Sequence, residues 1–147
     1  MQFSSRFTIA IHIFACIHTF EKEHKITSDF LAASVNVNPV IIRKLLVQLK
    51  GAGLITVQRG SGGASIARPP EAITFLDIFR AVECVEQGTL FHFHENPNTA
   101  CPVGRNIHKI LDDKLRRVQD AMEGEMAKIT VADVIADTQK YIEASAN

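Results

Sequence analysis

The first part of the chain carries apolar residues at the spacing of an α-helix. Between residue 4 or 5 and about residue 20, apolar positions recur every three or four residues, and further isoleucines widen the stripe. These positions are Phe7, Ile9, Ile11, Ile13, Phe14, Cys16 and Ile17. Because the apolar stripe is wide, we expect this first helix to be largely buried.

Two further helices are predicted next, each with a polar residue placed to cap it. A short helix over 29–34 follows Thr27 and Ser28, either of which can accept a hydrogen bond from a backbone N–H group at the helix start. A third helix over 39–51 follows Asn38 and begins with a proline, which lacks the N–H group that would otherwise have no partner. Its predicted buried face consists of Ile42, Leu45, Leu46 and Leu49.

The hydrophobic period then changes from about 3.6 to 2 residues. Gly53 is expected to end the third helix in the left-handed conformation. Alternating residues over 54–59 and 64–68 predict two strands, and the glycine-rich segment 60–63 lies between them. This pattern predicts a β-hairpin with a flexible tip, closed by two prolines at 69–70.

A fourth helix and a long loop follow the hairpin. Thr74 and Asp77 have the spacing of a capping box, and the helix that they start is expected to end near Glu83 or Glu86. Residues 87–102 contain glycine, two prolines and several polar residues, and they show no sustained period. We therefore expect this segment to be a loop.

The longest predicted helix begins at Val103. Its apolar positions step by three or four residues over about six turns. These positions are Val103, Ile107, Leu111, Leu115, Val118, Met122 and Met126. The stripe is longer than a small domain can cover by itself, so we expect the residues from Ile107 to Met122 to form a dimer contact. A capping box at 130–133 predicts a final short helix.

Composition sets broad limits on the protein class. The 147 residues are 46% hydrophobic, which is enough for one domain with a core that needs no disulfide or metal. No apolar run approaches the length of a membrane span, so we expect a soluble cytoplasmic protein without membrane partners. Three irregularly spaced cysteines do not form a secreted disulfide framework, which favours a reducing compartment.

A net charge of zero conceals an uneven distribution along the chain. Residues 1–68 hold eight Lys/Arg and three Asp/Glu, for a net charge of +5. Residues 69–147 hold eight Lys/Arg and thirteen Asp/Glu, for a net charge of −5. Such an arrangement is expected when one half meets a polyanion, although chance segregation of solvated charges would give the same numbers.

The order of the predicted elements is that of a winged helix-turn-helix. In that fold the third helix enters the major groove of DNA and the hairpin, or wing, lies along the backbone. The start of the third helix offers Asn38 and free N–H groups for phosphate, and Arg43 and Lys44 can project toward the groove. Arg59 and the glycines beside it suit close approach to the DNA backbone. Each basic residue alone would be read as a solvated surface charge.

Four motifs occur in the order found in one bacterial family. They are NPVIIRKLL at 38–46, AGLI at 52–55, RGSGGA at 59–64 and ITFLDIFRAVE at 73–83. With these motifs the chain resembles the Rrf-two family of bacterial transcription regulators, over nearly its whole length. The opening residues 4–7, the long helix and the motif at 130–133 extend the resemblance.

The resemblance implies a mainly α fold with one small β-hairpin, and a homodimer that binds a palindromic operator in double-stranded DNA, usually as a repressor. It divides the chain into a winged helix-turn-helix domain (1–83), an effector loop (84–102) and a dimerisation helix with a C-terminal helix (103–147). The implied DNA-contacting residues are Ser5, Arg6, Asn38, Pro39, Val40, Arg43, Lys44, Arg59, Gly60, Gly62 and Gly63.

The cysteines depart from the pattern of iron–sulfur members of this family, which carry three closely spaced cysteines before the long helix. Here Cys101 matches at most one of them, and Cys84 comes too early. Clusters are normally held by four thiolates or close substitutes, so His92, His94 and Glu95 would have to take part. We therefore expect no cofactor and a similarity to cluster-free members.

The loop before the long helix still holds candidate sensor residues. His92 and His94 could bind a metal ion together with Cys101, or they are ordinary loop histidines beside Phe91 and Phe93. Cys101 precedes a helix start that can expose it and lower its pKa, as in a redox thiol, although an inert packed cysteine fits the same sequence. A small-molecule or protein effector could act on this loop.

Two other classes of function were weighed against DNA binding. An enzyme would need a catalytic constellation, and the pair Cys101 and His108, seven residues apart, has poor geometry for nucleophilic catalysis. We therefore expect no enzymatic activity. A winged helix that serves only as a protein-interaction module is the stronger rival, and DNA retardation would distinguish the two.

Overall fold

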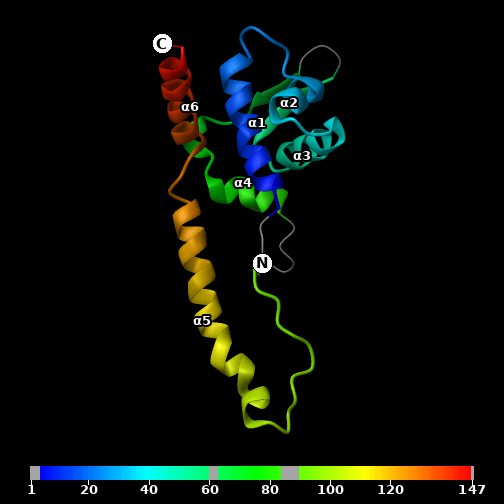
Figure 1. Cartoon of the computed structure of the whole chain (residues 1–147), viewed down its shortest axis with the longest axis vertical. Helices are drawn as coiled ribbons and strands as arrows, with labels where there is room; N and C mark the ends of the chain where they lie inside the picture. Colours follow the sequence, from blue (N-terminus) through cyan, green and yellow to red (C-terminus); the bar gives the residue numbers. More distant parts are fainter. Residues whose placement is uncertain (1–3, 60–62, 84–89, 147) are drawn as a thin grey trace.

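The computed structural model describes residues 4–59, 63–83 and 90–146, and in these ranges it shows the mainly α fold predicted from the sequence. The elements are α1 (Arg6–Phe20), α2 (Ser28–Val35), α3 (Pro39–Gly51), β1 (Ile55–Gln58), β2 (Gly63–Ile66), the short 3-10 helix η1 (Pro70–Ala72), α4 (Phe75–Val82), α5 (Pro102–Met126) and α6 (Val131–Ser145). Figure 1 shows a compact body formed by every element except α5, which extends away from it as an arm.

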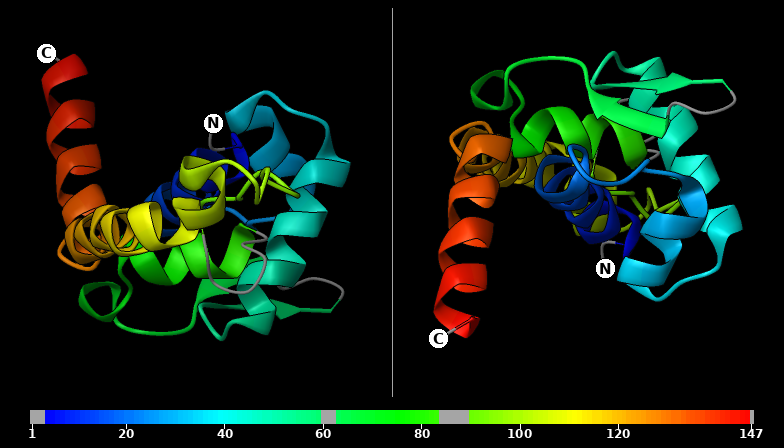
Figure 2. Two further views of the ribbon diagram at one scale, coloured as in Figure 1. Left: turned by 90° about the horizontal axis from the view of Figure 1, so that it is seen from below. Right: turned by 90° about the horizontal axis from the view of Figure 1, so that it is seen from above.

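Helix α1 lies at the centre of the body. Six of its fifteen residues are buried, among them Ile13, Phe14 and Ile17, which have no exposed surface. Figures 1 and 2 show α3 and the hairpin on one side of α1 and α6 on the other. Strand β2 of the hairpin and helix α6 both pack against α1, as the wide apolar stripe of α1 predicted.

Local capping contacts set the limits of α2 and α3. The Thr27 side chain accepts a hydrogen bond from the Phe30 N–H group (3.1 Å), and Asn38 Oδ1 accepts one from Val40 N–H (2.9 Å). Gly53 has a φ of +75°, the left-handed conformation expected there, and its N–H group donates to the Lys50 carbonyl at 2.9 Å. These contacts confirm the predicted start and end of α3.

The hairpin is antiparallel and is anchored to the segment before α2. Ile55 pairs with Ile66 at the base, and Gln58 pairs with Gly63. Gly63 has a φ of +72°, and a Cβ atom there would lie 2.7 Å from the Ile26 backbone nitrogen, so only glycine fits. The predicted flexible tip at 60–62 lies outside the described residues.

Helices α4 and α6 start side by side. Thr74 and Thr130 form an isolated antiparallel bridge, and both cap their helices through complete capping boxes with Asp77 and Asp133. Val131 and Ile135 of α6 lie in the same hydrophobic core as α1. The last helix has 15 residues and is not short, so the predicted length was wrong. Its first turns pack against α1 through the buried Val131 and Ile135, a long-range contact that local periodicity does not reveal.

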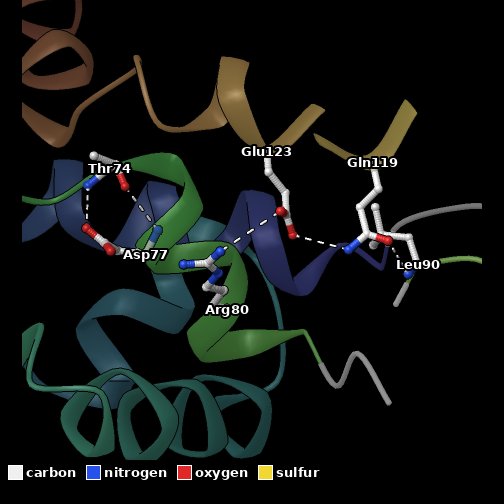
Figure 3. A network of polar contacts seen from close by, with 6 residues as sticks. All are labelled: Thr74, Asp77, Arg80, Leu90, Gln119 and Glu123. Carbon is white, nitrogen blue, oxygen red and sulfur yellow. Dashed lines mark hydrogen bonds and ion pairs between the residues drawn. The ribbon is translucent and has the colours of Figure 1, made fainter. Parts of the chain in front are cut away.

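Helix α5 contacts the body through a small polar network at its C-terminal part (Figure 3). Arg80 of α4 lies 4.0 Å from a carboxylate oxygen of Glu123. The Gln119 amide donates to Glu123 (3.4 Å) and its oxygen accepts from the Leu90 N–H group (3.2 Å). Within the described residues, no single helix is both long and apolar enough to cross a membrane, and the pair α2 and α3 reaches that length only across a 115° bend.

Candidate nucleic-acid interface

The outer face of α3 is basic and exposed. Arg43 and Lys44 both lie on the surface, and the residues of α3 include three basic and no acidic side chains. Pro39 is the first residue of the helix. Asn38 caps the helix by accepting a hydrogen bond from the Val40 N–H group. Since the buried face is formed by the four predicted residues, the basic side chains point away from the core.

A groove of about 430 Å³ lies between α3, the hairpin and the start of α2. Its lining combines basic side chains, two hydroxyl residues at a helix N-terminus and apolar walls. The lining residues are Ile26, Thr27, Ser28, Arg43, Leu46, Val47, Lys50, Val57, Gln58 and Gly63. The two cations on the α3 wall of the groove favour an anionic group such as a phosphate.

Three segments of the chain meet in this groove, and sequence patterns identified only part of it. Arg43 and Gly63 were candidates from the sequence. Lys50, which lines the same groove, was missed, although it lies seven residues after Arg43 and therefore on the same side of the helix. Thr27 and Ser28 were recognised as caps but not as part of a binding surface.

The remaining DNA-contact candidates lie in different places. Arg59 is exposed in the turn directly after β1, while Gly60 and Gly62 lie outside the described residues. Ser5 and Arg6 are at the start of α1, where Arg6 lies 3.8 Å from the Glu83 carboxylate after α4. Arg6 is thus already paired with an acidic side chain, whereas Arg43 and Arg59 have no ion pair with any residue that the structure describes.

The predicted dimer stripe on α5 stays accessible. None of the 25 residues of α5 is buried. Ile107, Leu111, Leu115 and Met122 are half-buried, and Val118 is 56% exposed. A groove of about 360 Å³ runs between this helix and the preceding loop, and its apolar walls are Phe91, Phe93 and Leu115. The helix therefore presents apolar surface that the described residues of this chain cover only in part.

The candidate sensor residues are exposed but do not converge. Cys101 immediately precedes α5, and the backbone N–H groups of Gly104 and Val103 lower the pKa of its thiol. His92 and His94 are both exposed, while Phe93 between them lies against the His108 ring at a tilt of 36°, with ring centres 4.2 Å apart. Among the described residues, no three His, Cys, Asp or Glu side chains are close enough to hold a metal ion.

Comparison with known proteins identifies similar chains. The model of the Rrf2 family, described as iron-dependent transcriptional regulators, matches residues 3–137. The HTH-type regulator YwnA of Bacillus subtilis (strain 168) is 42% identical over 132 residues, covering 90% of this chain and 96% of YwnA. A crystal structure described as a DNA-binding protein is 37% identical, with a TM-score of 0.69, and covers 89% of this chain and 99% of its own.

Similarity of fold alone extends further. The structure of T. potens IscR has a TM-score of 0.69 at 20% identity and covers 96% of this chain and 90% of that chain. The family description implies iron, but the described residues do not fit it. Cys16 is buried and donates to Ser34 Oγ at 3.1 Å, which leaves Cys101 as the accessible thiol of the described part. Cys84 lies outside the described residues.

Proposed function

This chain belongs to the Rrf2 family of transcriptional regulators, and from that premise we propose that it binds a palindromic operator as a homodimer and represses transcription. The observation that supports this most directly is the outer face of α3, which carries Arg43 and Lys44 and no acidic residue. This face borders the groove toward the hairpin. Helix and hairpin could then contact the major groove and the backbone beside it.

Charge supports the same surface. Residues 1–68, which form α1, α2, α3 and the hairpin, carry a net charge of +5. Each phosphate neutralised by Lys or Arg releases counterions, so the affinity would fall steeply as salt is raised. Arg43 and Lys50 on the groove wall and the exposed Arg59 after β1 could make such contacts without first breaking an ion pair to another described residue.

The homodimer is proposed from the exposed stripe of α5. A helix that buries none of its residues gains little stability from tertiary packing, and isolated helices are marginal in water. A second copy of α5 would cover Leu111, Leu115 and Val118. A two-fold dimer places two copies of α3 on successive turns of DNA, which is why a palindromic operator is expected. Since the target is chromosomal DNA, we place the protein in the cytoplasm.

An effector would act where the body meets α5. The loop over 90–101 touches α5 through the Leu90–Gln119 hydrogen bond and the Phe93–His108 ring contact. Glu123 links the same network to Arg80 of α4 (Figure 3). A ligand on this loop could change the angle between body and arm, and hence the spacing of the two α3 helices.

The test is to incubate the purified chain with fragmented genomic DNA and to sequence what it retains. We expect a palindromic sequence, a complex of two chains per site, and an affinity that falls with salt. Transcription from a promoter that contains this site should decrease when the protein is added. A chain that retains no DNA and instead binds only proteins would favour the interaction module.

A further inference from the structure

Helix α3 exposes apolar side chains between its basic ones. Val47 is 70% exposed and Val40 is 47% exposed. The two valines are seven residues apart, which is about two helical turns, so they lie on the same side of α3. Lys44 lies between them on that side, four residues after Val40 and three before Val47.

The fold of the single chain does not explain these valines. The buried face of α3 is complete with Ile42, Leu45, Leu46 and Leu49, and neither valine belongs to the hydrophobic core. At an exposed helix position, a β-branched residue forms helix less well than Lys, Glu or Gln. A surface that alternates Val, Lys and Val is therefore suited to a partner that is both anionic and locally apolar.

The major groove of DNA has this combination. Its walls are phosphates, and the C5-methyl group of thymine is the apolar group on its base edges. We propose that Val40 and Val47 read thymine methyl groups in the operator half-site, with Lys44 contacting DNA between them. The inference rests on the proposed function, because it requires α3 to be the helix that enters the groove.

The spacing makes the proposal specific. Two helical turns advance about 10 Å along α3. This matches about three base pairs if the helix follows the groove. A protein surface as the partner would also accept exposed valines, but the absence of acidic residues on α3 favours a polyanion. The half-site is thus expected to hold two thymines, each contributing through its methyl group.

The experiment compares thymine with deoxyuridine, which lacks the methyl group. Duplexes are selected from a random pool by the full-length protein, and each thymine is then replaced in turn by deoxyuridine. Wild type should bind about fourfold more weakly when a methyl that a valine buries is removed. Val47→Ala should lose this sensitivity at one position and Val40→Ala at another.

Two variants control the comparison. Val47→Thr keeps one γ-methyl group and should retain the sensitivity that Val47→Ala loses. Ile142→Ala removes a side chain of similar exposure (48%) from α6, on the other side of the body, and should keep both sensitivities. Thermal unfolding should be unchanged in all variants because these side chains are exposed.

The outcomes separate the inference from the function on which it rests. If wild type selects no duplex, the proposed function fails and the inference fails with it. If wild type binds a selected duplex but tolerates deoxyuridine at every position, the inference is overturned and operator binding stands. Methyl sensitivity that survives in both Val40→Ala and Val47→Ala also overturns it, because other side chains then read the methyl groups.

Discussion

The body and the α5 arm differ in how many of their residues are buried. Helix α1 buries six of fifteen residues, while α5 buries none of twenty-five. The body also includes α6, which follows α5 in the chain but packs against α1. The body therefore has its own hydrophobic core, whereas α5 leaves its apolar stripe accessible among the described residues.

The charged residues of α3, in the body, and of α5 also differ. On α3, Arg43, Lys44 and Lys50 face no acidic residue of the same helix. On α5, acidic and basic residues are mixed, and His108 and Asp112 form a pair at 3.3 Å one turn apart. Helix α3 thus carries positive charge alone, whereas α5 carries mixed charges beside an accessible apolar stripe.

The largest effect is expected from a charge in the middle of the arm's stripe. Leu115→Asp should yield monomers and abolish operator binding, because an unpaired carboxylate would be buried between two helices and two half-sites could no longer be engaged together. Sedimentation and DNA retardation measure both. Lys109→Ala makes the same change in net charge away from the stripe and should remain dimeric. Wild type that sediments as a monomer at micromolar concentration would contradict the dimer.

A second pair of variants tests whether the body folds independently of the arm. Leu45→Ala, at a fully buried site of α3, should lower the free energy of unfolding by about 2–5 kcal/mol at any protein concentration. Leu111→Ala should instead lower the thermal midpoint in a way that depends on protein concentration, because the proposed dimer places Leu111 against the second chain. Equal concentration dependence in both variants would mean that body and arm unfold as one dimeric unit.

Local sequence signals predicted most of the fold because they act within a few residues. The Asn38–Pro39 start, the left-handed Gly53 and the two capping boxes are each visible in the sequence and present in the structure. The position of α6 was not predictable. It depends on hydrogen bonds between segments far apart in the chain, such as Phe75 N–H to the Ile129 carbonyl at 2.8 Å.

The candidate site was also predictable from the sequence only in part. Exposure of Arg43 and Lys44 follows from the periodicity of one helix. The groove does not, because it needs Gly63 to fit against Ile26 and so place the hairpin beside α2 and α3. Thr27 and Lys50 became site residues only through this long-range contact.

Removal of single basic side chains tests where the body meets DNA. Arg43→Ala, Lys44→Ala and Arg59→Ala should each weaken binding by about 1–3 kcal/mol if the side chain contacts a base edge. Loss of a phosphate contact should weaken binding by less than that, and the affinity should then fall less steeply as the salt concentration is raised. Fluorescence anisotropy over a salt series measures both. Glu21→Ala is the control within the body, and basic variants that behave like it would show that the surface is misplaced.

The Cys101 thiol reports whether the start of the arm is folded. Its pKa is lowered by the N–H groups of Gly104 and Val103, so a larger fraction is thiolate below the ordinary cysteine pKa. The stabilisation is present above the unfolded pKa and is lost as the pH falls through the folded pKa. Alkylation of Cys101 by iodoacetamide, followed by mass spectrometry, should begin at lower pH in the native protein than in urea. The difference in pH between native protein and protein in urea should be smaller in Leu115→Asp if the start of the arm unfolds in this variant. Identical pH profiles of alkylation in native and unfolded protein would contradict the lowered pKa of Cys101.

No effect is expected from removing iron. Operator binding is proposed to depend on the body and on contacts between two arms, and the described residues bring no three metal-ligating side chains together. Anaerobically purified protein should therefore show no visible iron–sulfur absorbance, and a chelator should leave its affinity for DNA unchanged. Stoichiometric iron and sulfide, with binding altered by their removal, would contradict this prediction. Cys101 would then have to be joined by ligands from outside the described residues, where Cys84 lies, and the segment between body and arm would be a metal-dependent switch.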